Sequence, residues 1–313
     1  MSFSFRQIRY FVATAESGQV SQAAMDLHVS QSAITTAIKG LEGLLGTKLF
    51  DRHAHGVVLT YEGHQFLQHA QHISAAVEEA MRLPSRANAS IEGTVNLVVS
   101  YTVAGYFLAP YLSRFTRSFP NIDVRLKEAD REDIEEGMIT GTYDLAMILA
   151  SNLGNQEDIL VEVLFRSRRR LWLDSGHRLA REPSVSLQDV SIEPYIMLTV
   201  DEASNTALRY WNQTAYRPNV IFRTSSVEAV RSLVANGTGV AILSDMVYRP
   251  WSLEGQRVEV TAVTDTIPTM DVGLAWTRNS ERSPATNAFC EFMHLAVASS
   301  QPHVSAPMPQ KAD

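Results

Sequence analysis

Apolar and polar positions near the start of the chain repeat with the period of an α-helix. Four apolar residues recur at steps of four, three and four, which puts them on one helix face: Ile34, Ile38, Leu41 and Leu45. Ser30 precedes this stretch as an N-cap residue would, and Gly46 suits the left-handed position after a last turn. The pattern predicts a helix between these two residues, with the four apolar side chains on its inner face.

Small residues and two short β-like runs flank this helix. Ala23 and Ala24 would allow a preceding helix to cross closely, because larger side chains would hold the two helices apart. Residues 48–52 and 57–60 have strand character and are joined by 53–56, which predicts a hairpin. Two crossed helices followed by a hairpin are typical of a helix-turn-helix with a wing, an arrangement that reads DNA.

The outer face of the predicted helix carries short polar side chains and one cation. Such side chains suit contact with base edges, and a wing arginine suits contact with phosphate or the minor groove. The candidate DNA-binding residues are Ser30, Gln31, Ser32, Thr35, Thr36, Lys39 and Arg52. Three ordinary packed helices are the alternative interpretation, which leaves the polar cluster unexplained.

The residues after the hairpin predict a long helix over 61–82, with Thr60 as its cap. Its apolar residues follow the seam of a coiled coil: Phe66, Ala70, Ile73, Val77 and Ala80. A stripe of this kind could also cover a globular core. We favour dimerisation, on the expectation that little else of the chain covers this helix. A two-fold dimer would need a roughly palindromic DNA site with half-sites about one helical turn apart. Residues 83–92 contain proline and small polar residues and are predicted to be a hinge.

From residue 93 onward, apolar strands alternate with helical patterns, which predicts α/β structure with a parallel sheet. Strands are expected at 94–100, 122–128, 143–149, 195–199, 220–224, 239–243 and 270–276. Helices are expected at 103–119, 131–140, 203–214 and 226–236. The two groups of elements predict two lobes over 93–297, with chain crossings in 159–173 and 257–276. The tail, 298–313, has a composition typical of disorder.

Ligands of open α/β sheets bind beyond the carboxyl ends of the strands. Hydroxyl side chains and one apolar residue stand at those ends and are the candidate effector-binding residues: Ser100, Tyr101, Thr102, Leu149, Thr199, Thr224 and Ser226. Hydroxyls at helix starts favour an anion, so a small organic acid is the leading effector class, with amino acids also considered. Helix capping alone is the alternative for each hydroxyl. Asp201 and Glu202 would repel a carboxylate if they faced the cleft, and the effector would then carry an amine.

The chain has 313 residues, 45% of them hydrophobic, and a net charge of −7. The acidic excess lies entirely beyond residue 90, so DNA affinity would depend on local contacts and paired copies rather than on bulk charge. No apolar run is long enough to cross a bilayer, and the first residues lack the layout of a secretory signal, so a cytoplasmic location is expected. We expect no membrane partner.

An enzyme is disfavoured, because the sequence has no nucleophile elbow, phosphate loop or metal-ligand cluster, and neither a cofactor nor a metal is expected. Two hypotheses remain. One is a ligand-responsive transcriptional regulator, and the other is a solute-binding α/β module with a helical dimerisation domain that lacks specific DNA recognition.

The N-terminal motif resembles that of LysR-type transcriptional regulators. The resemblance is carried by Ala23–Ala24, Ser30–Gln31–Ser32–Ala33, Leu41–Glu42, Leu45–Gly46, Leu49–Phe50, Arg52, Leu59–Thr60 and Gly63. Thr35 and Ala37 depart from the family's usual serine and glutamine, which bears on the preferred DNA sequence rather than on the fold.

The resemblance implies an α/β protein with an N-terminal all-α winged helix-turn-helix over 1–60 and a two-lobed, periplasmic-binding-protein-like (type 2) regulatory domain. It implies double-stranded DNA and a small-molecule effector as partners, a homotetramer built as a dimer of dimers, and RNA polymerase as a candidate further partner. One branch of the family senses oxidants through cysteines. Cys290 is the only cysteine of this chain, and we expect it to be a buried, inert thiol.

Overall fold

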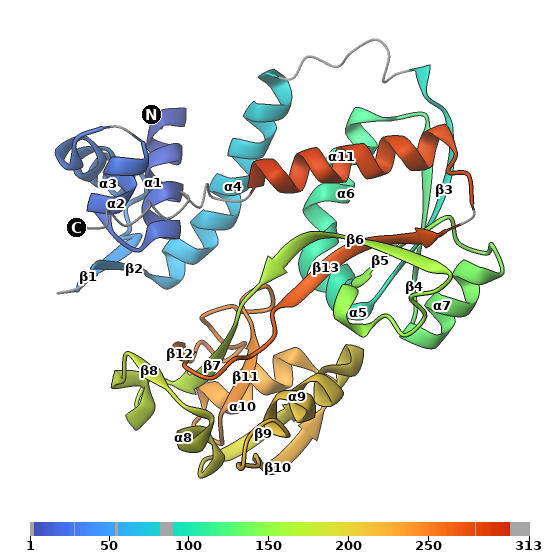
Figure 1. Cartoon of the computed structure of the whole chain (residues 1–313). Coiled ribbons are helices and arrows are strands. Elements are labelled where there is room, and N and C mark those ends of the chain that lie inside the picture. Colours follow the sequence, from blue (N-terminus) through green and yellow to red (C-terminus); the bar gives the residue numbers. More distant parts are fainter. Residues whose placement is uncertain (1–2, 28, 54–55, 82–89, 279, 301–313) are drawn as a thin grey trace, which may run out of the picture. The chain divides into compact units, whose positions relative to one another are not determined.

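The computed structural model describes residues 3–27, 29–53, 56–81, 90–278 and 280–300. The chain forms two compact units, Met1–Ser85 and Arg86–Asp313. Figure 1 shows helices with a small hairpin in the first unit and two groups of strands with their helices in the second.

The first unit begins with three helices packed around an apolar core. They are α1 (Phe5–Ser17), α2 (Val20–Asp26) and α3 (Gln31–Leu45). Ala23 and Ala24 are buried in this core, as the close crossing requires. Ile34, Ile38 and Leu41 are buried as predicted, but Leu45 is 38% exposed. The prediction for Leu45 was wrong because the buried stripe ends one turn before the helix does.

The hairpin and the long helix are tied to α3 by short polar contacts. The hairpin is formed by β1 (Phe50–His53) and β2 (Gly56–Leu59), and α4 follows over Tyr61–Met81. The Glu42 carboxylate accepts hydrogen bonds from the backbone N–H groups of Leu49, at 2.8 Å, and Phe50, at 3.3 Å. The Thr60 hydroxyl donates to the Lys48 carbonyl at 2.8 Å and accepts from the Gly63 N–H at 2.9 Å, so it caps α4 as predicted.

The first half of α4 packs against α1 of the same chain. The Phe66 ring lies 5.1 Å from the Phe11 ring, Ala70 is fully buried, and Ile73 packs against the same core. The expectation that little else covers this helix was therefore wrong for Phe66, Ala70 and Ile73. An intrachain core and a coiled coil both produce this apolar spacing, so the pattern alone does not separate them.

The first lobe of the second unit contains a five-stranded sheet in the order β4-β3-β5-β13-β6. The strands are β3 (Gly93–Val99), β4 (Ile122–Glu128), β5 (Leu145–Leu149), β6 (Ile159–Ser167) and β13 (Met270–Thr277). One continuous helix consists of α5 (Tyr101–Val103), a wider π turn (Ala104–Leu108) and α6 (Ala109–Ser118). This helix and α11 (Pro284–Ser300) pack on one face of the sheet, and α7 (Arg131–Ile139) packs on the other face. Alternate residues of β5 pack into the cores on the two faces of the sheet, which explains why this strand is uniformly apolar.

The second lobe has a sheet with helices on both faces. Its strands are β7 (Arg169–Asp174), β8 (Ser184–Val185), β9 (Pro194–Leu198), β10 (Asn219–Thr224), β11 (Ala241–Ser244) and β12 (Val258–Val263). Its helices are α8 (Leu187–Ser191), α9 (Ala203–Trp211) and α10 (Val227–Ala235). A parallel bridge between Tyr195 and Val240 joins the β9–β10 pair to β11. Trp211 and Tyr210 of α9 fill one core, and Val230 and Val234 of α10 face the other.

Both sheets are mixed rather than parallel, which corrects the predicted sheet type. β13 runs antiparallel to β5 and β6, and β7 runs antiparallel to β11 and β12. The reason is the path of the chain. β6 continues into β7 of the other lobe and β12 leads back into β13, so each crossing strand enters its second lobe against the direction of its neighbours.

Gly63 provides a test of the junction between α3, the hairpin and α4. A Cβ at this position would lie 2.1 Å from the Leu49 carbonyl oxygen, whereas a Cβ at Gly43 would meet nothing within 4 Å. We expect Gly63→Ala to lower the free energy of unfolding by at least about 2 kcal/mol, because backbone must move. Gly43→Ala should raise it by about 0.5–1 kcal/mol.

Urea unfolding of the full chain, followed by far-UV circular dichroism, measures both changes. Equal midpoints for Gly63→Ala and the unsubstituted chain would contradict the close approach at Leu49.

Candidate nucleic-acid interface and ligand cavity

Helix α3 begins with a complete N-cap. The Ser30 hydroxyl accepts a hydrogen bond from the Ala33 N–H at 3.2 Å and lies 2.9 Å from the Ser32 hydroxyl. Part of the polar cluster at this helix start therefore stabilises the helix itself.

The remaining candidates on α3 form its outer face. Gln31, Ser32, Thr36 and Lys39 are exposed, whereas Thr35 is half-buried. Arg52 belongs to β1 of the hairpin, and its side chain lies outside the described part of the structure. The face opposite the buried Ile34 and Ile38 thus presents hydrogen-bonding groups and one cation, which suits a DNA groove.

A cavity of about 440 Å³ lies between the two lobes of the second unit. It opens at the carboxyl ends of β3, β4, β5 and β9, where the topology places ligands. Four of the predicted effector residues line it: Ser100, Tyr101, Leu149 and Thr199. Ser100 is 8% exposed, and its hydroxyl has no hydrogen-bond partner among the described residues.

Thr224 and Ser226 line neither this cavity nor the smaller one beside it. The Thr224 hydroxyl accepts from the Ser226 N–H at 3.1 Å, and the Ser226 hydroxyl accepts from the Ala229 N–H at 3.1 Å at the start of α10. Helix capping, the alternative interpretation, accounts for Ser226, and a local turn hydrogen bond accounts for Thr224.

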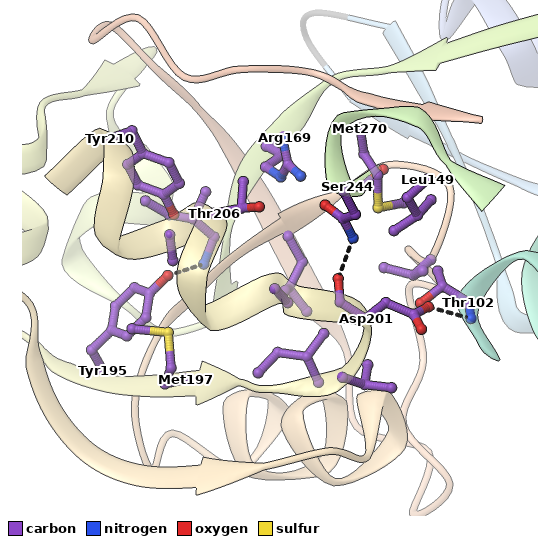
Figure 2. Close-up of a pocket in the computed structure, with 18 residues that line it drawn as sticks. Thr102, Leu149, Arg169, Tyr195, Met197, Asp201, Thr206, Tyr210, Ser244 and Met270 are labelled. Carbon is purple, nitrogen blue, oxygen red and sulfur yellow. Dashed lines mark hydrogen bonds between the residues drawn. The ribbon is translucent and has the colours of Figure 1, made fainter. Parts of the chain in front are cut away.

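Thr102 does not line the larger cavity, where an effector-binding residue was expected. It lines the smaller cavity, of about 40 Å³, and its N–H donates to the Asp201 carboxylate at 2.6 Å (Figure 2). The Asn152 side-chain amide donates to the Asp201 backbone carbonyl. Asp201 of the second lobe thus occupies a backbone donor of the first lobe that was expected to bind an effector anion.

Asp201 and Glu202 both line the larger cavity, which answers the question that their sequence position left open. Their backbone φ angles are 48° and 60°, in the left-handed region that non-glycine residues adopt at a cost of about 1–2 kcal/mol each. This backbone conformation leads into α9.

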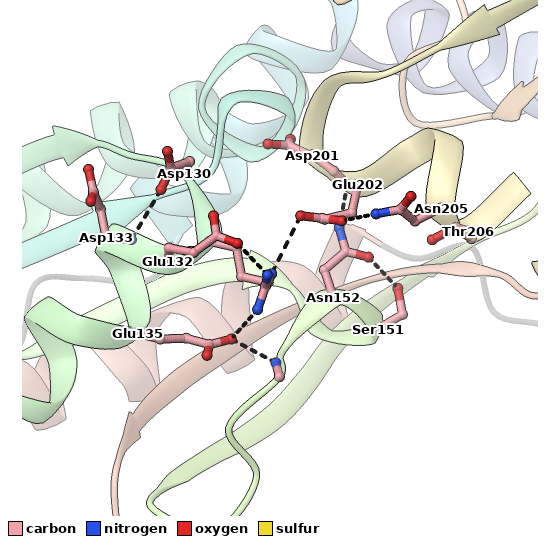
Figure 3. A network of polar contacts seen from close by, with 12 residues as sticks. Asp130, Glu132, Asp133, Glu135, Ser151, Asn152, Asp201, Glu202, Asn205 and Thr206 are labelled. Carbon is pink, nitrogen blue, oxygen red and sulfur yellow. Dashed lines mark hydrogen bonds and ion pairs between the residues drawn. The ribbon is translucent and has the colours of Figure 1, made fainter.

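The first lobe contributes an acidic wall that the sequence patterns did not predict. Four further carboxylates line the cavity: Glu128, Asp130, Glu132 and Glu135. Arg131 contacts Glu132, Glu135 at 3.7 Å and Glu202 at 3.5 Å. Figure 3 shows the side chains of these three acids directed toward one another. Burial alone would lower the pKa of the Arg131 guanidinium, but these carboxylates raise it. The signal was present in the sequence, because residues 128–136 are rich in acids directly after a strand end.

Comparison with known proteins assigns both units. A family model described as "LysR substrate binding domain" matches residues 88–297, and one described as "Bacterial regulatory helix-turn-helix protein, lysR family" matches residues 5–64. The chain belongs to the LysR family. This LysR-family protein is a DNA-binding transcriptional regulator with an effector-binding domain, and not an enzyme.

Individual relatives agree with this assignment. The chain is 28% identical over 292 residues to the transcriptional dual regulator GltC of Bacillus subtilis, covering 92% of this chain and 95% of the relative. It is similar to the crystal structure of HinK, a LysR family regulator of Pseudomonas aeruginosa, with a TM-score of 0.62, 26% identity and coverage of 95% and 99% of the two chains. It also shares the fold of CbnR in complex with its target DNA, with a TM-score of 0.54, 21% identity and coverage of 94% and 100%.

The described residues contain neither a candidate membrane span nor a candidate metal-ligand cluster. None of the described helices has the length and apolar character needed to span a membrane. Within the same residues, His, Cys, Asp and Glu side chains form no group of three or more arranged to hold a metal ion.

Cys290 of α11 tests whether this regulator carries a reactive thiol. It is 4% exposed, and burial raises the pKa of its thiol, so little thiolate forms at neutral pH. We expect the native chain to react with Ellman's reagent far more slowly than the urea-unfolded chain at the same pH. Cys290→Ser should remove the signal altogether, since no other cysteine is present. Equal rates in the folded and unfolded states would contradict an inert thiol.

Proposed function

We propose that this regulator reads a roughly palindromic promoter site with α3 and its wing, and changes its DNA binding when an effector occupies the cavity between the lobes. The observation that carries the DNA-reading assignment is the division of α3 into a buried apolar face and an exposed polar face. In this proposal Gln31, Thr35 and Lys39 contact the groove, and Arg52 contacts phosphate. The match to both LysR models disfavours a solute-binding module without DNA recognition.

Pairing of the chains is part of the proposal. The apolar core around α1 includes α4 residues up to Ile73, among those the structure describes, and the next residue of the stripe, Val77, is half-buried. We assign pairing to this later half of α4, within a linker helix over 61–82 that precedes a hinge at 83–92. A homotetramer acting in the cytoplasm, with RNA polymerase as a further partner, completes the proposal.

The effector acts by shifting the relative populations of lobe arrangements. Among the described residues, contacts of Asp201 and Glu202 with Thr102, Asn152 and Arg131 join the lobes around the cavity. A ligand that binds one arrangement more tightly than another favours that arrangement. The resulting shift reaches the DNA-binding unit through the hinge and alters the pose of the paired readers.

Gel-shift titration with DNA from upstream of its own gene tests the DNA-reading assignment. Gln31→Ala should weaken binding to the specific site by about 1–3 kcal/mol and leave non-specific binding nearly unchanged, because a base contact is lost. Arg52→Ala should weaken binding to both DNAs and reduce the salt dependence, because a phosphate contact is lost.

Gln188→Ala provides the matched control, since Gln188 is an exposed glutamine of α8 in the other unit. Equal losses on both DNAs for Gln31→Ala would remove it as a base reader. Absence of any sequence-specific retardation by the unsubstituted chain would overturn the proposed function.

Val77 tests the pairing surface on α4. Val77→Lys should lower the mass of the oligomer measured by sedimentation equilibrium, because it places a charge in an apolar seam. Gln68→Lys, at an exposed position of the same helix, should leave the mass unchanged. An unchanged mass for Val77→Lys would show that the chains pair elsewhere.

A further inference from the structure

We infer that the effector of this regulator is an organic cation, an amine with an apolar body, bound in the 440 Å³ cavity between the lobes. This inference rests on the proposed function and adds the chemical class of the ligand. It replaces the organic acid expected from the hydroxyls at the strand ends.

The wall of the cavity carries a strong excess of negative charge. Six carboxylates line the cavity against a single guanidinium, that of Arg131. Arg131 is already surrounded by Glu132, Glu135 and Glu202. An anionic ligand would therefore enter a field of like charge, whereas a cation would relieve repulsion among the acids.

Three acids of the wall also bind backbone N–H groups that lie beside the cavity, so those donors are not free to bind a carboxylate ligand. The Thr102 N–H donates to Asp201 at 2.6 Å, and the Gly154 N–H donates to Glu135 at 2.7 Å. The Asp133 N–H, at the start of α7, donates to the Asp130 carboxylate at 3.1 Å. An organic acid would have to displace one of these carboxylates and then lie beside its negative charge.

Ser100 is an independent indication of a ligand. Its hydroxyl oxygen is buried and lacks a partner among the described residues, although it belongs to a residue that lines the cavity. Leaving a hydroxyl unpaired costs about 1–3 kcal/mol, and an ammonium N–H would satisfy its lone pair. In this proposal the Ser100 side chain turns toward the cavity and accepts from the head group, with Glu128 supplying negative charge on the same wall.

The apolar part of the lining indicates that the ligand also has an apolar body. Ile134, Ile148, Leu149, Leu153 and Val200 contribute hydrocarbon to the same cavity. The carboxylates do not gather in a set of three or more suited to a metal ion within the described residues. A dispersed acidic wall with an apolar floor suits an organic amine better than a compact inorganic cation.

A thermal-shift assay on the full chain tests the charge of the ligand with matched probes. Each probe pair shares a carbon skeleton and differs in the head group: hexylamine and hexanoate, phenethylamine and phenylpropionate, putrescine and succinate. We expect at least one amine to raise the melting temperature in a saturable manner while its carboxylate partner does not, because only a ligand of the folded state stabilises it. Stabilisation by carboxylates, by magnesium chloride alone, or by no amine of the panel would overturn the inference.

Two substitutions test whether the amine binds in this cavity. Ser100→Ala should weaken amine binding about tenfold in isothermal titration calorimetry, as expected for loss of a hydrogen bond to a charged group. Glu128→Gln should weaken it severalfold and reduce its salt dependence. Asp123→Asn is the matched control, because Asp123 lies on the same strand outside the cavity and pairs with Arg125 at the surface. Unchanged affinity in both cavity variants would overturn the assignment to this cavity.

The gel shift separates this inference from the proposed function. If the chain binds its specific DNA in the gel shift but no amine binds, the proposed regulatory function is retained and the inference of a cationic effector is wrong. If specific DNA binding is absent, the proposed function fails whatever the ligand assay shows. Release or tightening of specific DNA by the stabilising amine, and not by its carboxylate partner, would support both.

Discussion

The two strand crossings between the lobes are the constraint on which the regulatory unit depends. β6 leads into β7 and β12 leads back into β13, and these crossings make both sheets mixed. They also leave a cleft that side-chain contacts bridge. The contacts from Thr102, Asn152 and Arg131 all end on Asp201 or Glu202. Two adjacent residues in left-handed backbone thus hold much of the described contact between the walls.

The acids of the cleft have a structural role, and the proposed ligand would give them a binding role as well. Asp201, Glu135 and Asp130 satisfy backbone donors, and their charges remain in the cavity wall. Carboxylates placed in this way stabilise the unliganded protein and, under the proposed binding mode, would disfavour an anionic ligand. The ligand class would then depend on side chains that fill backbone donors, and not on the sheets that form the cleft.

Local patterns predicted the elements of this chain well. Ser30, Gly46 and the small pair Ala23–Ala24 specify α3 and its neighbour through interactions within a few residues or one close crossing. Ser100 and Thr199 were found because a topology rule places strand ends at the cleft.

The errors arose where one local pattern has two physical causes. A hydroxyl that caps a helix, such as Ser226, looks the same in sequence as one that contacts a ligand. The α4 stripe has the same spacing whether it covers α1 or a second chain. Four of the six acids of the wall stand in one segment, 128–135, and only their approach to Asp201 and Glu202 depends on how the lobes meet.

The packing of α4 on α1 has a mechanical consequence. The first turns of α4 are packed against the core that includes α3, through Phe66, Ala70 and Gly63. This packing leaves little room for α4 to bend relative to α3. The residues after Ile73 extend this fixed base by about 1.5 Å each along the helix axis. A rotation imposed at the far end of α4 would therefore turn α3 with it, instead of being lost by bending near the hairpin.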